Sequence, residues 1–124
     1  MICCLEHAFS MKLKENQKEQ YVLILSEHGI ENEVTDLSHS YDSYIRVIIN
    51  EDEEEFSIDL FENNKNLFSF KRTQYHRMIP IRDEEEYSIQ FVLERWQSRM
   101  IKVQWKPYLH IEFGLYYEVC EDCD

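Results

Sequence analysis

The sequence predicts an α+β fold in which helices cover one face of an antiparallel sheet. Two observations lead to this prediction. Apolar and polar residues alternate with the period of β-strands from Tyr44 to Arg72, and residues 12–28 and 84–99 each combine helix-forming residues with helical spacing. The predicted order is an N-terminal helix, a three-stranded antiparallel meander, a second helix and a C-terminal β-hairpin.

The first predicted helix begins near Lys12 and ends near His28. Its composition favours a helix, and Gly29 follows as a stop signal. Four apolar residues fit one side of this helix: Leu13, Tyr21, Ile24 and Leu25. Residues 31–43 are polar and are expected to form a short edge strand and a loop.

The meander contains three strands whose register follows from the alternation of apolar residues. Pairing Ile49 with Phe56 leaves the acidic residues 51–54 as the first loop. Pairing Leu60 with Phe68 leaves a three-residue loop, residues 63–65, and sets Phe61 against Leu67. Both pairings place apolar side chains on the same face of the sheet, so we expect that face to be buried.

The second predicted helix covers residues 84–99. Asp83 and Glu86 resemble a capping box, and several apolar residues recur at helical spacing: Ile89, Val92, Leu93, Trp96 and Met100. The alternative is a mostly β fold in which residues 86–106 form a further hairpin, since Tyr87, Ile89, Phe91 and Leu93 also alternate.

The last predicted element is a β-hairpin. It consists of alternating runs at residues 101–106 and 109–119, with Pro107 between them. At 124 residues the chain is long enough for one core, so we expect a single domain over residues 1–124. The two ends, residues 1–10 and 120–124, are candidates for mobile segments.

The charge of the chain bounds its partners. The formal net charge is −12, and such a protein repels nucleic acid and anionic membranes unless its bases are segregated. We therefore expect a basic protein surface as the partner, with no direct nucleic-acid binding and no membrane. No signal-peptide pattern opens the sequence, and no apolar run approaches the roughly 20 residues that span a bilayer, so a cytoplasmic protein is expected.

The candidate binding site is the acidic loop between the first two strands of the meander. It contains five consecutive carboxylates: Glu51, Asp52, Glu53, Glu54 and Glu55. Like charges this close repel one another unless a cationic partner neutralises them, and a basic groove on another protein would do so. Tyr44 and Phe61 are the candidate aromatic anchors for that partner.

These observations favour a non-enzymatic binding protein that inhibits or neutralises a partner with a basic site. Toxin immunity proteins and phage counter-defence proteins have this character, and their targets include proteins that handle nucleic acids. No catalytic motif of useful specificity is present, and a homo-oligomer is compatible with the aromatic content. The rival prediction is a small enzyme or nucleotide-binding domain that uses the basic segment 65–82 as an anion site.

The four cysteines lie near the two ends of the chain. Cys120 and Cys123 have a spacing that suits half of a tetrahedral zinc site, whereas the adjacent Cys3 and Cys4 make a poor second half. The sequence therefore favours ordinary thiols over a zinc site, and we expect no cofactor.

Overall fold

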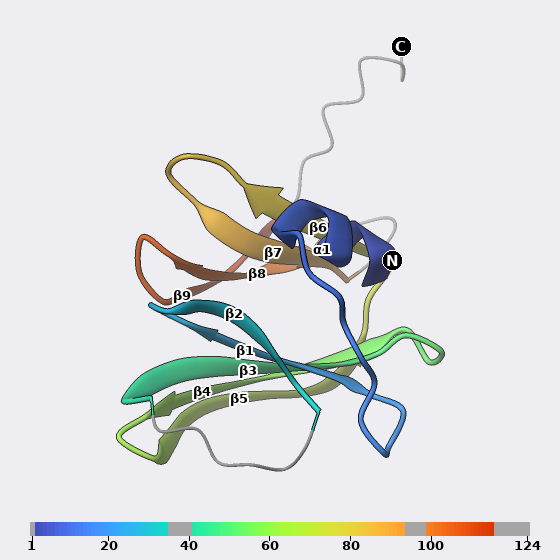
Figure 1. Ribbon diagram of the computed structural model, residues 1–124, viewed down its shortest axis with the longest axis horizontal. Coiled ribbons are helices and arrows are strands. Elements are labelled where there is room, and N and C mark those ends of the chain that lie inside the picture. Colours follow the sequence, from blue (N-terminus) through green and yellow to red (C-terminus); the bar gives the residue numbers. More distant parts are fainter. Residues whose placement is uncertain (1, 35–40, 94–98, 116–124) are drawn as a thin grey trace.

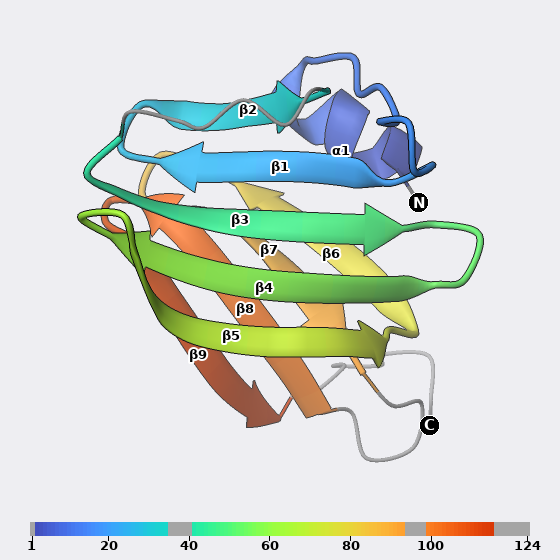
Figure 2. The same ribbon diagram turned by 90° about the horizontal axis from the view of Figure 1, so that it is seen from below.

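The protein is a sandwich of two antiparallel β-sheets, seen edge-on in the computed structural model (Figure 1). The structure describes residues 2–34, 41–93 and 99–115. A five-stranded sheet has the order β2-β1-β3-β4-β5, and a four-stranded sheet has the order β6-β7-β8-β9. The strands of the second sheet run obliquely across those of the first (Figure 2).

The five-stranded sheet consists of β1 (Tyr21–Ser26), β2 (Gly29–Glu33), β3 (Ser43–Asn50), β4 (Glu55–Glu62) and β5 (Lys65–Gln74). The four-stranded sheet consists of β6 (Arg77–Arg82), β7 (Tyr87–Val92), β8 (Arg99–Lys106) and β9 (His110–Leu115). The helix of the described chain is α1 (Ile2–Phe9), which lies alongside β6 (Figure 1). No helix within the described ranges is long and apolar enough to cross a membrane.

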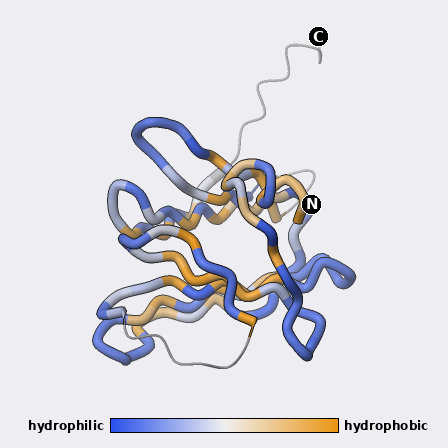
Figure 3. The backbone as a smooth tube through the Cα atoms, in the orientation of Figure 1, coloured by the Kyte–Doolittle hydropathy of each residue, from blue (hydrophilic) through white to orange (hydrophobic). Residues whose placement is uncertain are grey.

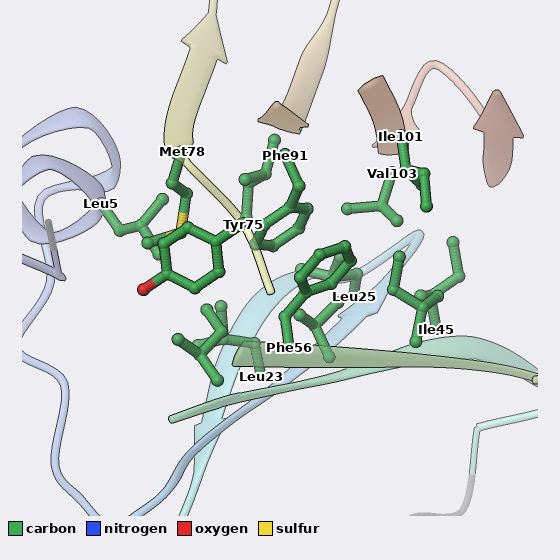
Figure 4. Close-up of a cluster of buried hydrophobic side chains, with 14 of the residues drawn as sticks. Leu5, Leu23, Leu25, Ile45, Phe56, Tyr75, Met78, Phe91, Ile101 and Val103 are labelled. Carbon is green, nitrogen blue, oxygen red and sulfur yellow. The ribbon is translucent and has the colours of Figure 1, made fainter. Parts of the chain in front are cut away.

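The core fills the space between the two sheets. Phe56 on β4 stacks on Phe91 on β7, with ring centroids 4.1 Å apart and planes only 5° from parallel (Figure 4). Both rings are almost completely buried, as are Ile58 on β4 and Ile89 on β7. Hydrophobic residues concentrate in α1 and in the central parts of the strands, whereas the loops are hydrophilic (Figure 3). Burial of this apolar surface is the main source of stability for the sandwich.

The predicted helix over residues 12–28 is wrong. Tyr21–Ser26 forms β1, which pairs with β2 so that Ser26 faces Gly29 across the turn at Glu27 and His28. Gly29 has a φ of +112°, so it accommodates a turn conformation instead of ending a helix. Residues 22–26 are buried on both faces of the sheet, and a continuous apolar run of this kind has no period that distinguishes a strand from a buried helix.

The predicted second helix over residues 84–99 is also wrong. Residues 87–92 form β7, residues 99–106 form β8, and the two strands pair antiparallel, as the alternative hairpin over 86–106 requires. The residues that resemble a capping box lie in a hairpin loop. Asp83 Oδ1 accepts the backbone N–H groups of Glu85 and Glu86 at 2.8 and 2.7 Å. Asp83 therefore closes the loop between β6 and β7, because a side-chain oxygen can cap a turn as well as a helix. The predicted α+β fold class is therefore wrong, and the fold is mostly β.

The meander prediction is confirmed in its register around the first hairpin. Ile49 faces Phe56, and Glu51–Glu54 form the loop between β3 and β4. Leu60 faces Phe68 as predicted in the second hairpin.

The turn of the second hairpin is shorter than predicted. Glu62 pairs with Lys65, so the loop contains only Asn63 and Asn64, with φ values of 52° and 65°. Two consecutive residues of positive φ form the turn type whose twist matches that of the strands, and asparagine tolerates this conformation. A bulge after Leu60 absorbs the difference, and it places Phe61 opposite Asn66 instead of Leu67.

The structure describes the N-terminal end of the chain and the first part of the C-terminal hairpin. Within the segment 1–10, a candidate for a mobile end, α1 forms and buries Ile2, Leu5 and Phe9 in the core. The ring of Phe9 lies 5.1 Å from that of Trp105. The C-terminal hairpin is confirmed as β8 and β9. The later part of its predicted second strand and the segment 120–124 lie outside the described residues.

Candidate functional site

Hydrogen bonds within the acidic loop between β3 and β4, and from the loop to the connection before β6, support its backbone. The backbone N–H of Glu53 donates to Asn50 Oδ1 at 3.1 Å, and the N–H of Glu54 donates to the carbonyl of Glu51 at 3.2 Å. The carbonyl of Glu54 in turn accepts the N–H of Tyr75, at the start of the connection to β6, at 2.9 Å. The loop therefore presents its side chains from a defined backbone.

Two of the five predicted carboxylates have partners within the chain. Glu51 Oε2 accepts the backbone N–H of Ile2 at 2.7 Å, where the first turn of α1 has N–H groups without partners inside the helix. Figure 2 shows this loop on the same side of the molecule as the start of α1. Glu55 pairs with Arg72 Nε at 3.3 Å across β4 and β5.

The other three carboxylates face solvent. Asp52, Glu53 and Glu54 are exposed. Within the described part of the chain, no lysine or arginine lies within ion-pair distance of them. These three side chains are therefore available to a cationic partner.

The tertiary structure brings two further carboxylates to this end of the molecule. Glu6 on α1 and Glu15 in the segment before β1 lie near Tyr21, as does Glu51. Burial of the Tyr21 phenol raises its pKa, and a hydrogen bond to Glu15 and the charges of the three carboxylates raise this pKa further. We call the loop Glu51–Glu54 together with Glu6 and Glu15 the acidic end. Glu6 and Glu15 carry no sequence signal that links them to the loop, since only the fold brings these segments together.

The predicted aromatic anchors lie at the opposite end of the same hairpin. Tyr44 and Phe61 face each other on β3 and β4, and their rings stack with centroids 4.9 Å apart. The guanidinium of Arg46 lies 4.9 Å from the centre of the Phe61 ring. Tyr44 lies six positions before Asn50, which ends β3 at the loop, and this corresponds to about 20 Å of strand. The structure therefore does not combine these aromatic residues with the acidic loop in one site.

Three bases of the segment 65–82 are distributed over both sheets. Lys65 lies at the turn between β4 and β5, whereas Arg82 lies at the end of β6 in the other sheet. Arg72 is paired with a carboxylate, and Arg82 Nη1 donates to the carbonyl of Ala8 at 3.1 Å. Lys65, Arg72 and Arg82 therefore do not form one cluster, and the anion site of the segment 65–82 stays a prediction.

The structure describes two of the four cysteines that were considered for a zinc site. Cys3 and Cys4 are free and exposed on α1, and Cys120 and Cys123 lie outside the described residues. Among the residues that the structure describes, no group of three or more histidine, cysteine, aspartate or glutamate side chains has the arrangement of a metal site.

The fold and the site define a small antiparallel β-sandwich protein with an acidic end. The chain belongs to the family described as protein of unknown function (DUF3979), whose model matches residues 7–122. The match includes both sheets and the acidic loop. No curated protein and no solved structure matched the chain.

Proposed function

We propose that this protein binds another protein through its acidic end and occludes a basic site on that partner. The observation that carries the proposal is the hydrogen-bonded loop that exposes Asp52, Glu53 and Glu54 without bases of the described chain beside them. A loop that is ordered before binding loses little conformational entropy when the complex forms. Clustered charge also steers a partner of opposite sign and raises the association rate.

The proposed partner is a protein that handles nucleic acids, because such proteins carry basic grooves for phosphates. The net charge of −12 makes direct binding of nucleic acid unfavourable and makes occlusion of a basic groove favourable. The proposal therefore describes a cytoplasmic, non-enzymatic inhibitor of the toxin immunity or phage counter-defence type. The acidic loop supplies its specificity.

A pair of matched variants tests the proposal. Glu53→Gln/Glu54→Gln removes two charges from the loop between β3 and β4. Glu84→Gln/Glu85→Gln removes two charges from the exposed loop between β6 and β7 and leaves the net charge of the two variants equal. Each tagged protein is used to capture partners from an extract of the host at low and at moderate salt, and affinities are then measured by calorimetry with the purified partner.

We expect a captured protein with a basic surface, bound by the wild type and by the Glu84/Glu85 variant alike. The Glu53/Glu54 variant should bind it about tenfold more weakly at low salt, since each surface charge contributes roughly 0.5–1 kcal/mol, and the difference should shrink as salt increases. Equal losses in both variants would assign binding to net charge and would refute the role of the loop. Unchanged binding in both variants would refute the role of the acidic end.

A further inference from the structure

A second surface lies at the other end of the five-stranded sheet, eight residues of β3 away from the acidic loop, or about 25 Å. Here a hollow of about 530 Å³ is enclosed by the turn between β1 and β2, by residues 41–43 and by the connection between β8 and β9. A second hollow of about 310 Å³ lies between β9 and the inner face of β3, β4 and β5. Leu109 lines both hollows, so they adjoin at this residue, and we call the two together the groove.

The second hollow is apolar and open to solvent. Its walls include Ile45, Leu60 and Phe68 from the five-stranded sheet, and Ile111 and Phe113 from β9. The ring of Phe113 lies 5.8 Å from that of Phe68 across the two sheets, yet 52% of Phe113 remains exposed. An exposed apolar surface of this kind is typical of a binding site, because leaving it in water costs about 25 cal/mol per Å².

The first hollow is anionic and aromatic. Glu27 and Asp42 line it together with Tyr41 and Tyr108, and Tyr108 is 62% exposed. His28 also lines it, and its Nε2 lies 3.6 Å from Glu27 Oε1. Tyr41 is itself stacked on His28, with ring centroids 4.9 Å apart. No lysine or arginine lines either hollow among the described residues. Carboxylates beside aromatic faces are a favourable setting for a lysine or arginine side chain.

We propose that this groove binds an extended segment of another protein through two side chains. A lysine or arginine of the segment lies between Glu27 and Asp42, and an aliphatic or aromatic side chain packs against Phe68 and Phe113. An extended segment suits the groove because side chains two residues apart lie about 7 Å from each other on one side of a strand. The volumes of the two hollows are also those of side-chain and small-ligand sites. The groove is separate from the acidic end, so this proposal does not rest on the proposed function.

A random heptapeptide library displayed on phage provides the probe, with the immobilised full chain as target. We expect the enriched peptides to combine a lysine or arginine with a leucine, isoleucine, methionine or phenylalanine nearby. Binding of a synthetic enriched peptide is then measured by fluorescence anisotropy. The affinity should fall about tenfold in Glu27→Gln/Asp42→Asn and by a similar factor in Phe113→Ser, as for the loss of a central contact.

Two controls separate this site from others. Val34→Ser removes an exposed apolar side chain outside the groove, and Glu53→Gln/Glu54→Gln removes two carboxylates from the acidic loop. Both should leave peptide affinity unchanged. The Glu27/Asp42 variant changes only exposed side chains, so it tests the site even when Phe113→Ser does not fold.

Several outcomes would overturn the proposal. They are the absence of enrichment, enrichment of peptides without the basic and apolar pair, and peptide affinity that the groove variants do not change. A dimer in sedimentation equilibrium that dissociates in Phe113→Ser would also overturn it, because the occupant would then be a second copy of this chain.

Discussion

Replacing Tyr75 with phenylalanine should stabilise the protein at neutral pH and reduce its loss of stability at alkaline pH. Tyr75 is 3% exposed, and its hydroxyl is buried without a hydrogen-bond partner among the described residues. Its ring packs edge-on against Phe56 and Phe91, at centroid distances of 6.1 and 6.0 Å. Figure 4 shows the hydroxyl directed away from those two rings. Phenylalanine would therefore keep the ring contacts and remove only the hydroxyl.

The magnitude at neutral pH follows from the cost of burying a hydroxyl without a partner. That cost is about 1–3 kcal/mol, and the variant avoids it. Because a small void replaces the oxygen, we expect a net gain of about 1 kcal/mol in the free energy of unfolding.

The magnitude at alkaline pH follows from the pKa. Burial raises the pKa of Tyr75 to about 12, with the charges of Glu51 and Glu54 as further causes, whereas an unfolded tyrosine titrates near 10. The unfolded chain therefore loses the proton first. The free energy of unfolding is therefore unaffected by this titration below pH 10. It falls as the pH rises toward 12, by about 3 kcal/mol in all. Tyr75→Phe lacks this loss.

Urea unfolding followed by circular dichroism at a series of pH values measures both effects, provided that the slope m is unchanged. The difference between wild type and variant isolates Tyr75 from the other tyrosines, since those titrate in both proteins. Tyr108→Phe, at an exposed tyrosine, is the matched control and should change neither quantity. A variant less stable than wild type by more than about 1 kcal/mol at neutral pH would show that the hydroxyl is bonded. Parallel pH profiles would show that the pKa of Tyr75 is not raised.

Three further predictions concern the loop, the core and a turn. Glu51→Gln should lower the free energy of unfolding by about 0.3–1 kcal/mol, because the negative charge at the first turn of α1 is lost. Phe56→Ala should cost about 3–5 kcal/mol, because its ring stacks on Phe91 in the centre of the core. Asn64→Val should cost about 1–2 kcal/mol, whereas Asn64→Gly should be neutral or stabilising, because residue 64 has a positive φ. Urea unfolding measures all three.

Each of these predictions has an outcome that contradicts it. Glu84→Gln is the control for the loop, and an equal effect of both substitutions would indicate net charge instead of the helix contact. A loss below about 1 kcal/mol for Phe56→Ala would show that the two sheets do not pack through this pair. Equal stability of the valine and glycine variants at residue 64 would contradict the left-handed conformation of the turn.

Sequence patterns predicted the strands that have one face buried in the core and the other face exposed to solvent. Around Ile49 and Phe56 the alternation is clean, and a slip of one residue would expose every apolar side chain, so the register followed directly. The same logic failed for residues 22–26, because both faces of β1 are covered and alternation disappears. It failed at Asp83 for a different reason, since the same side-chain hydrogen bond closes a helix or a hairpin loop.

The candidate site divides in the same way. The run of carboxylates and its place in a hairpin loop are local properties, so residue order alone determined them. Which carboxylates remain available depended on contacts between distant segments: Ile2 binds Glu51, Arg72 binds Glu55, and α1 brings Glu6 to the loop. Likewise, the groove at the other end exists only because two sheets meet there. Hydrogen bonds and hollows between segments far apart in the chain follow from packing, and packing has no counterpart in the spacing of residues along one strand.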